Sequence, residues 1–177
     1  MEKAFLLEDG ELKIPVKITY PDTGAPRRVV LGVHGIGGST EDHIQQSLAE
    51  EMGFFSAAMV RFDMPCHGAS PMTGEEFSLR NCMGALLAVA RLAKETFPQT
   101  QGLCVFATGF GAYVTLTALE ELLQIEEDIR LVVQTPSVMM HQTLLSMLRI
   151  SKETFRSMDS YTLPLRRPLT VTYSFYK

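Results

Sequence analysis

Three short loops contain the residues of this sequence that are best suited to chemistry. They are 34–38, with the sequence H-G-I-G-G, 63–70, with D-M-P-C-H-G-A-S, and 107–112, with A-T-G-F-G-A. Each loop follows a short apolar run of the kind that forms a buried strand. Glycines in such loops let the backbone approach a ligand closely and point its N–H groups inward. The three loops are therefore the candidate ligand site.

Alternating strands and helices are predicted to position these loops. Short apolar runs predict buried strands over 29–33, 54–62, 103–107 and 131–133. Apolar residues at helical spacing predict helices over 40–52, 78–97 and 111–123. Such alternation predicts an α/β fold with a parallel sheet and right-handed crossovers. Ligands bind at the carboxyl ends of strands in a sheet of this kind, and the three loops lie at those ends.

The two ends of the sequence depart from this rhythm. At the start, strands 4–8 and 11–20 flank an Asp-Gly dipeptide that favours a tight antiparallel hairpin. After Pro136 the alternation is lost, although 139–158 has helical periodicity. We therefore expect a core over residues 1–137 and a cap-like or truncated segment over 138–177.

Composition narrows the class of protein. Hydrophobic residues make up 46% of the 177 residues and charged residues 20%, as in ordinary globular domains. A net charge of −4 without a basic stripe argues against nucleic acid and anionic membranes as partners. No apolar run approaches the roughly 20 residues of a membrane span. Cys66, Cys82 and Cys104 have no metal-binding spacing and are odd in number, so we expect a cytoplasmic protein without a metal.

The order and spacing of the hairpin and the three loops resemble those of the α/β-hydrolases, over roughly residues 4–135. The closest likeness is to small bacterial esterases and lysophospholipase-like hydrolases that carry a cap. The resemblance implies an α/β-hydrolase-type, mostly parallel sheet with an N-terminal antiparallel hairpin, with the later strands missing from this sequence. It also implies carboxylic-ester hydrolysis without a cofactor, acting on a small acyl or aromatic ester.

The resemblance assigns a role to several residues. Backbone N–H groups of Ile36 and Phe110 would form the oxyanion hole, within a loop whose backbone includes Gly35 and Gly37. His34 would brace that loop and would not act as a base. Three residues would shape the second loop and are not members of the family's catalytic triad: Asp63, His67 and Ser70.

One position departs from the family pattern in a way that bears on catalysis. The nucleophile motif G-x-S-x-G corresponds to residues 107–111, and Gly109 stands where the family has serine. Thr108 lies one residue early, so its hydroxyl is expected to point elsewhere. His141 is the only histidine beyond this motif, and it comes too early to be the family's triad histidine. We therefore expect a catalytically impaired or inactive chain.

Several alternatives remain open. The same pocket could hold a small ligand without cleaving it, as a binding or interaction module. A thiol nucleophile at Cys66 beside His67 is a weaker reading, because adjacent residues seldom present both groups to one atom. Dinucleotide binding at Gly35-Ile36-Gly37 is weak too, since the G-x-G-x-x-G pattern would need glycine at Thr40. Finally, residues 131–135 are expected near a sheet edge, where self-association or cover by residues 138–177 should follow.

Overall fold

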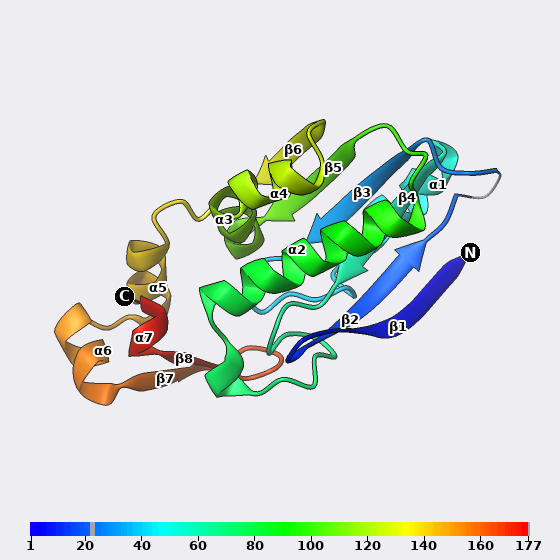
Figure 1. Cartoon of the computed structure of the whole chain (residues 1–177). Helices are drawn as coiled ribbons and strands as arrows, with labels where there is room; N and C mark the ends of the chain where they lie inside the picture. The colour runs from blue at the N-terminus through cyan, green and yellow to red at the C-terminus, as the bar shows by residue number, and fades with distance from the viewer. Residues whose placement is uncertain (22–23, 177) are drawn as a thin grey trace.

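The computed structural model describes residues 1–21 and 24–176, which are built around a six-stranded sheet (Figure 1). The strand order is β1-β2-β4-β3-β5-β6. The strands are β1 (Glu2–Asp9), β2 (Leu12–Thr19), β3 (Arg28–Val33), β4 (Ala57–Phe62), β5 (Leu103–Thr108) and β6 (Ile129–Gln134). β3, β4, β5 and β6 are parallel, whereas β1 and β2 are antiparallel. The predicted mostly parallel sheet with an N-terminal antiparallel hairpin is confirmed.

The hairpin differs from its prediction by one residue. Asp9 pairs with Leu12, so the two turn residues are Gly10 and Glu11, not Asp9 and Gly10. Gly10 has φ +61°, which glycine adopts without a steric penalty. Along β2 the alternation of apolar and polar residues buries one face of the strand against the core, as expected for a period of two.

Helices cover both faces of the sheet. In Figure 1, α2 (Leu79–Thr96), α3 (Gly109–Thr117) and α4 (Leu119–Ile125) lie in front, and α1 (His43–Phe54) lies behind. α2 begins at the N-cap Ser78, whose hydroxyl accepts a hydrogen bond from the Asn81 N–H. Its buried face includes Cys82, Leu86 and Val89, so the apolar stripe correctly predicted this helix.

Two element boundaries, of α1 and of β4, differ from their predictions. The predicted helix at 40–52 begins at His43, and the Thr40 N–H binds the Asp63 side chain of the second loop. The buried face also differs from the predicted stripe: Ile44 is 47% exposed, while Gln45 and Ala49 are buried. The strand predicted from residue 54 begins only at Ala57.

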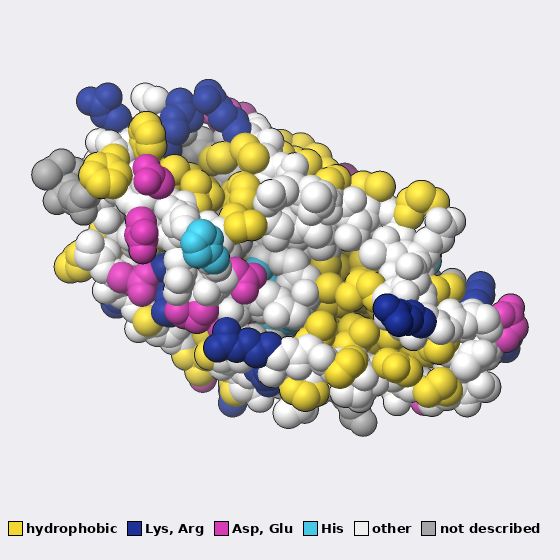
Figure 2. All heavy atoms as spheres, turned by 180° about the vertical axis from the view of Figure 1, so that it is seen from behind, with side chains coloured by type: hydrophobic (Ala, Val, Ile, Leu, Met, Phe, Trp, Pro, Cys, Tyr) yellow, Lys and Arg dark blue, Asp and Glu magenta, His cyan; other side chains and the backbone are white. Residues whose placement is uncertain are grey.

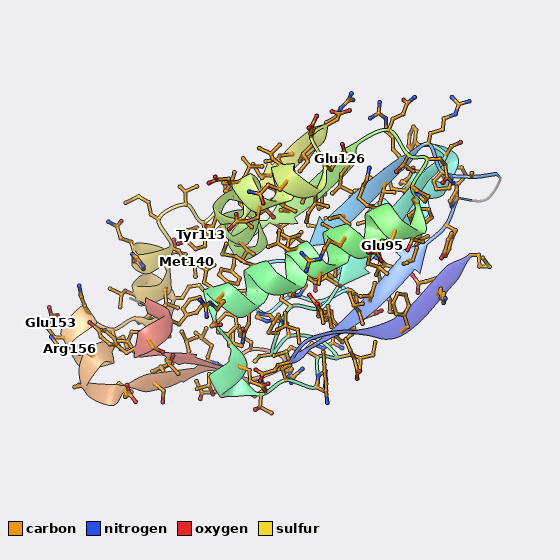
Figure 3. The ribbon with its side chains drawn as sticks, viewed as in Figure 1. Glu95, Tyr113, Glu126, Met140, Glu153 and Arg156 are labelled. Atoms are coloured by element: carbon orange, nitrogen blue, oxygen red, sulfur yellow. The ribbon has the colours of Figure 1, made fainter. Side chains whose placement is uncertain are left out.

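The front face and the far edge hold two further differences. The helix predicted over 111–123 is two helices, α3 and α4, which meet at Ala118. Glu126 follows α4 (Figure 3) and forms an ion pair with Lys94 of α2. β6 is the last strand of the sheet, as predicted for residues 131–135, but the burial expected from its apolar run is not found, since Val132 is 52% exposed. Within the described residues, no strand pairs with its outer edge.

Residues after β6 form a segment beyond the carboxyl ends of the parallel strands (Figure 1). Its elements are α5 (Met140–Leu148), α6 (Lys152–Met158), β7 (Ser160–Leu163), β8 (Leu169–Thr172) and α7 (Tyr173–Tyr176). The single helix expected over 139–158 is divided because Arg149 adopts a left-handed conformation, with φ +54°. β7 and β8 form an antiparallel hairpin whose buried side chains belong to the main core. Lys177 lies outside the described residues.

Hydrophobic side chains also gather on the surface. Seen from behind, they form patches that include the end of the molecule carrying the C-terminal segment (Figure 2). The exposed apolar residues around β6 and the start of α5 are Val132, Val133, Val138 and Met139. Among the described residues, no helix has both the length and the hydropathy needed to cross a bilayer.

Candidate functional site

The first and third loops meet at the carboxyl ends of the neighbouring strands β3 and β5. Gly109 adopts φ +51°, and a Cβ placed there would lie 3.8 Å from the Gly35 Cα. Conversely, a Cβ on Gly35 would lie 3.5 Å from the Thr108 carbonyl oxygen. The backbone thus makes a sharp turn at Gly109 from strand to helix, directly beside the glycine-rich loop. A side chain at position 109 would point into open space next to that loop.

Close packing of backbone fixes the start of α3. A Cβ on Gly111 would lie 2.3 Å from the His34 carbonyl oxygen and 2.7 Å from that of Val33, so only glycine fits. Phe110 is buried in the first turn of the helix. The first backbone N–H groups of a helix have no partner within it and carry the positive end of its dipole. An anion or a developing negative charge would therefore be stabilised at this position.

His34 joins the first loop to the second. The Met64 N–H donates to His34 Nε2 at 3.0 Å, so the protonated Nδ1 donates to the Gly35 carbonyl oxygen at 2.7 Å. The ring is buried, and this burial lowers its pKa. Both ring nitrogens are occupied and the ring is neutral, so His34 serves to hold the backbone of the two loops together.

Asp63 organises the second loop. Its carboxylate accepts hydrogen bonds from the Thr40 N–H at 2.7 Å and from the Ala69 N–H at 2.8 Å. Gly68 has φ +50° and packs against this carboxylate, where a Cβ would lie 2.3 Å from its carbon. Ser70 Oγ accepts from the Cys66 and Met72 N–H groups. The polar side chains of this loop therefore satisfy its own backbone.

The geometry does not favour a thiol nucleophile at Cys66. Its Sγ donates to the Thr73 carbonyl oxygen at 2.8 Å, and burial raises the pKa of the thiol to about 11. A thiol with that pKa is protonated at neutral pH and is unreactive. His67 donates from Nδ1 to the Pro65 carbonyl oxygen at 2.9 Å, and burial is the main cause that lowers its pKa to about 3.

Arg167, which sequence reasoning passed over, reaches the second loop from the β7–β8 connection. Its guanidinium donates to the carbonyl oxygens of His67, Gly68, Ser70 and Met72, at 3.2, 3.0, 2.6 and 3.0 Å. Leu165 of the same connection lies against Gly37, whose Cβ would be 2.9 Å from a Leu165 methyl carbon. Through Leu165 and Arg167 the C-terminal segment therefore contacts the first and second loops.

An aromatic cluster lies next to the strand-to-helix turn. Phe110 is 5.7 Å from Phe77 and 5.9 Å from Phe175, measured between ring centroids. Phe77 and Phe175 are stacked at 4.7 Å. α7 thus places an aromatic ring against the residue that follows Gly109. The sequence carries no signal for this contact, because the alternation of strands and helices is lost after Pro136.

A cavity of about 750 Å³ opens beside the first two loops. It is lined from β1 and β2 by Phe5, Val16 and Lys17, and from the first loop by Gly37. Charged and apolar side chains complete the lining, among them Glu41, Asp63, Arg166, Arg167 and Pro168. Neither Gly109 nor Phe110 lines it, so this cavity is separate from the strand-to-helix turn.

Comparison with solved structures finds hydrolases along nearly the whole chain. Est1E from Butyrivibrio proteoclasticus, with ferulic acid bound, is 18% identical at a TM-score of 0.80, covering 98% of this chain and 69% of Est1E. Mouse alpha/beta hydrolase domain-containing protein 10 is 15% identical at 0.70, covering 98% and 68%. A serine hydrolase without lid from Xanthomonas campestris is 23% identical at 0.63, covering 75% of this chain and 60% of that one.

The chain therefore has the α/β-hydrolase fold, and the predicted superfamily resemblance is confirmed at the level of the fold. It spans about two thirds of the length of the first two of these proteins. No protein-family model matches the sequence. A search of curated proteins finds no match either. Among the described residues, no group of three or more His, Cys, Asp or Glu side chains is arranged to hold a metal ion.

Proposed function

We propose that this chain is an esterase-like α/β-hydrolase-fold protein that does not turn over esters. The observation that carries the proposal is Gly109. It occupies the apex of the turn between β5 and α3 with φ +51°, next to Gly35, and it has no side chain with which to attack a carbonyl carbon. Acyl transfer by this fold needs a nucleophile at that apex, activated by a base.

The neighbouring polar residues do not replace the missing nucleophile and base. His34 uses both of its nitrogens to hold the backbone, and His67 has a pKa too low for an effective base. Cys66 is held as a protonated thiol. Thr108 is the last residue of β5, one position before the apex, and His141 has an exposed side chain on α5.

The remaining site roles follow from the same proposal. Ile36 and Phe110 would supply the backbone N–H groups of an oxyanion hole, in a loop shaped by Gly35 and Gly37. The contact between Gly35 and the turn at Gly109 supports this assignment. Residues 1–137 would be the hydrolase core, and 138–177 a cap-like segment. This division is supported by the coverage of the two matches: the match to Est1E extends over 98% of the chain, whereas the match to the hydrolase without lid covers 75%.

A second candidate function is binding of a small acyl or aromatic ligand without cleavage. The cavity of about 750 Å³ favours it, because small-molecule sites commonly have volumes of roughly 300–1,000 Å³.

Self-association through β6 is a further proposal, supported by the exposure of that edge strand. A cytoplasmic location remains a prediction, and the three free cysteines are consistent with a reducing compartment.

Hydrolysis of p-nitrophenyl acetate tests the leading proposal. The expected rate is slow, proportional to substrate concentration and unchanged in the variants Cys66→Ala and Thr108→Val. Slow background is allowed, because an oxyanion hole and binding alone can leave roughly 10³–10⁴-fold acceleration over water. Saturable turnover at the 1–10³ s⁻¹ typical of enzymes would overturn the proposal. Loss of such turnover in either variant would then identify the nucleophile.

A further inference from the structure

The cavity beside Gly37 combines an apolar wall with cationic side chains. Phe5 and Pro15 of the β1–β2 hairpin, both half-buried, line one side, and Pro168 contributes a further apolar surface. Arg166 and Arg167 enter the lining from the β7–β8 connection. A site that is apolar over most of its wall, with a few polar groups to fix orientation, is typical of small-molecule binding.

The two carboxylates in the lining are already engaged. Asp63 accepts from two backbone N–H groups, at 2.7 and 2.8 Å. Glu41 forms an ion pair with Lys17, which raises the pKa of the lysine and lowers that of the glutamate. Asp63 keeps its charge, so the lining holds three cations, Lys17, Arg166 and Arg167, against two carboxylates, a formal net charge of +1.

The two arginines, in contrast, have no carboxylate partner. Arg167 spends its N–H groups on four carbonyl oxygens, which do not cancel its charge. Arg166 is exposed, and none of the ion pairs among the described residues includes either arginine. The cavity therefore carries an excess of positive charge at its β7–β8 side. An arginine with free N–H groups is well suited to bind a carboxylate in a bidentate manner.

We propose that this cavity binds a small amphipathic carboxylate, with the carboxylate on Arg166 and the apolar body against Phe5, Pro15 and Pro168. The charge of Arg167 would add to the attraction while its N–H groups remain on the loop. This inference rests on the second candidate function, small-ligand binding, and makes it more specific. It does not depend on whether the chain hydrolyses esters. It also separates the ligand site from the strand-to-helix turn, because the cavity includes neither Gly109 nor Phe110.

Calorimetric titration with 4-phenylbutyrate and its uncharged analogue 4-phenylbutyramide tests the inference. The carboxylate should bind at least tenfold more tightly than the amide, a difference of about 1.4 kcal/mol. Arg166→Gln should remove most of that preference and leave binding of the amide unchanged. Phe5→Ser should weaken the binding of both compounds. Arg166 is exposed, so its substitution is not expected to disturb folding.

Arg156→Gln is the matched control, because Arg156 projects from α6 at the far end of the C-terminal segment (Figure 3). It removes the same charge and should leave both affinities unchanged. If the two compounds bind equally tightly, the proposed anion site is overturned, but the second candidate function, binding of a small ligand, still stands. If neither compound binds, both the anion site and the small-ligand function are overturned. Equal weakening by Arg156→Gln and Arg166→Gln would show attraction to net charge only, and would also overturn the proposal.

Discussion

Two glycines two residues apart in the strand-to-helix turn are required for different reasons. At Gly109 the constraint is φ +51°, since a Cβ there would touch only the Gly35 Cα, at 3.8 Å. At Gly111 the constraint is space, because a Cβ would lie 2.3 Å from the His34 carbonyl oxygen. A side chain at position 109 would be strained in the left-handed region, whereas a side chain at position 111 would force two backbone segments apart.

Gly109→Ala should therefore lower the free energy of unfolding by about 1–2 kcal/mol, the cost of a left-handed non-glycine residue. Gly111→Ala should cost more than 3 kcal/mol, roughly the upper range of overpacking, or prevent folding. Urea unfolding of both variants measures the difference. Similar losses in the two variants would mean that the backbone of α3 can shift away from His34, against the packing described here.

His67 should make stability depend on pH. Its folded-state pKa of about 3 lies below the value near 6.5 of an unfolded histidine. The unfolded chain therefore binds the additional proton between these values, and stability is lost as pH falls from about 6.5 toward 3. Through His67, the free energy of unfolding should be about 2 kcal/mol lower at pH 5 than at pH 7. Comparing urea unfolding of wild type and His67→Phe at both pH values measures it, and an unchanged pH dependence would contradict the prediction.

The sequence located the residues of the site better than their contacts. The glycines, His34 and Asp63 were found because strand ends and loops alternate in a recognisable order. Arg167 was missed because its partners are carbonyl oxygens 95 to 100 residues upstream, and a carbonyl leaves no trace in the sequence. Phe175 was missed for a similar reason, since its stacking on Phe77 depends on how the C-terminal segment folds back.

At the scale of elements, the β7–β8 connection fastens the C-terminal segment to the second loop. Arg167→Ala would leave four carbonyl oxygens without their charged donor, and a hydrogen bond to a charged group contributes roughly 1.5–3 kcal/mol. Three of the four oxygens share the two hydrogens of Nη1, and water can reach this half-buried site, so the four contributions do not add in full. We expect a net loss of about 2–4 kcal/mol in the free energy of unfolding. Arg166→Ala, the neighbouring substitution, should change it by less than about 0.5 kcal/mol.

Hydrogen exchange of the amides of residues 67–70 and 72 distinguishes a local from a general effect. In Arg167→Ala these amides should exchange faster than in the wild type, while those of β3 and β5 should be unchanged, because the clamp acts on the loop directly. Equal stability losses in the two arginine variants would contradict the clamp. Uniformly faster exchange throughout the sheet would show that Arg167 supports the whole fold and not this loop.

Element prediction succeeded where periodicity alone decides the structure. α2 was predicted closely because its apolar stripe and Ser78 cap agree. α1 begins later than predicted, after the Thr40–Asp63 contact, and buries Gln45 and Ala49 instead of Ile44. The edge position of residues 131–135 was predicted correctly, but β6 was also expected to be buried because its composition is apolar. Burial depends on a neighbouring strand, however, and sequence composition does not report whether one is present.

At the scale of the molecule, the outer edge of β6 should pair with another chain. Val132 and Val133 are exposed on a strand whose outer backbone groups have no partner strand within the described residues. Exposed apolar edges of this kind promote association, and a charged side chain on the edge suppresses it. We expect sedimentation velocity to show a dimer whose population grows with protein concentration.

Val132→Lys should weaken this dimer by roughly tenfold or more, about 1.4 kcal/mol. Phe54→Lys is the matched control, since Phe54 is 77% exposed at the end of α1 and away from β6. It should leave the association constant unchanged. A wild-type chain that stays monomeric at all concentrations, or equal weakening by both substitutions, would contradict pairing through β6.

Under the proposed function, this α/β-hydrolase fold lacks both the nucleophile and the base for ester cleavage. Restoring the nucleophile alone tests it most directly. A serine hydroxyl needs a neighbouring base that is itself held in place by a third group. Position 109 has room for the new side chain, because a Cβ there meets only the Gly35 Cα. Gly109→Ser should therefore fold, with the modest loss expected of Gly109→Ala.

The measurement is covalent labelling of Gly109→Ser by a fluorophosphonate probe, with Gly109→Ala and wild type as controls. Melting curves of the same samples show that each variant is folded. We predict that all three proteins remain unlabelled at neutral pH and hydrolyse p-nitrophenyl acetate equally slowly. Rapid labelling of Gly109→Ser alone, with saturable ester turnover, would contradict the account, because it would place a working base within reach of residue 109.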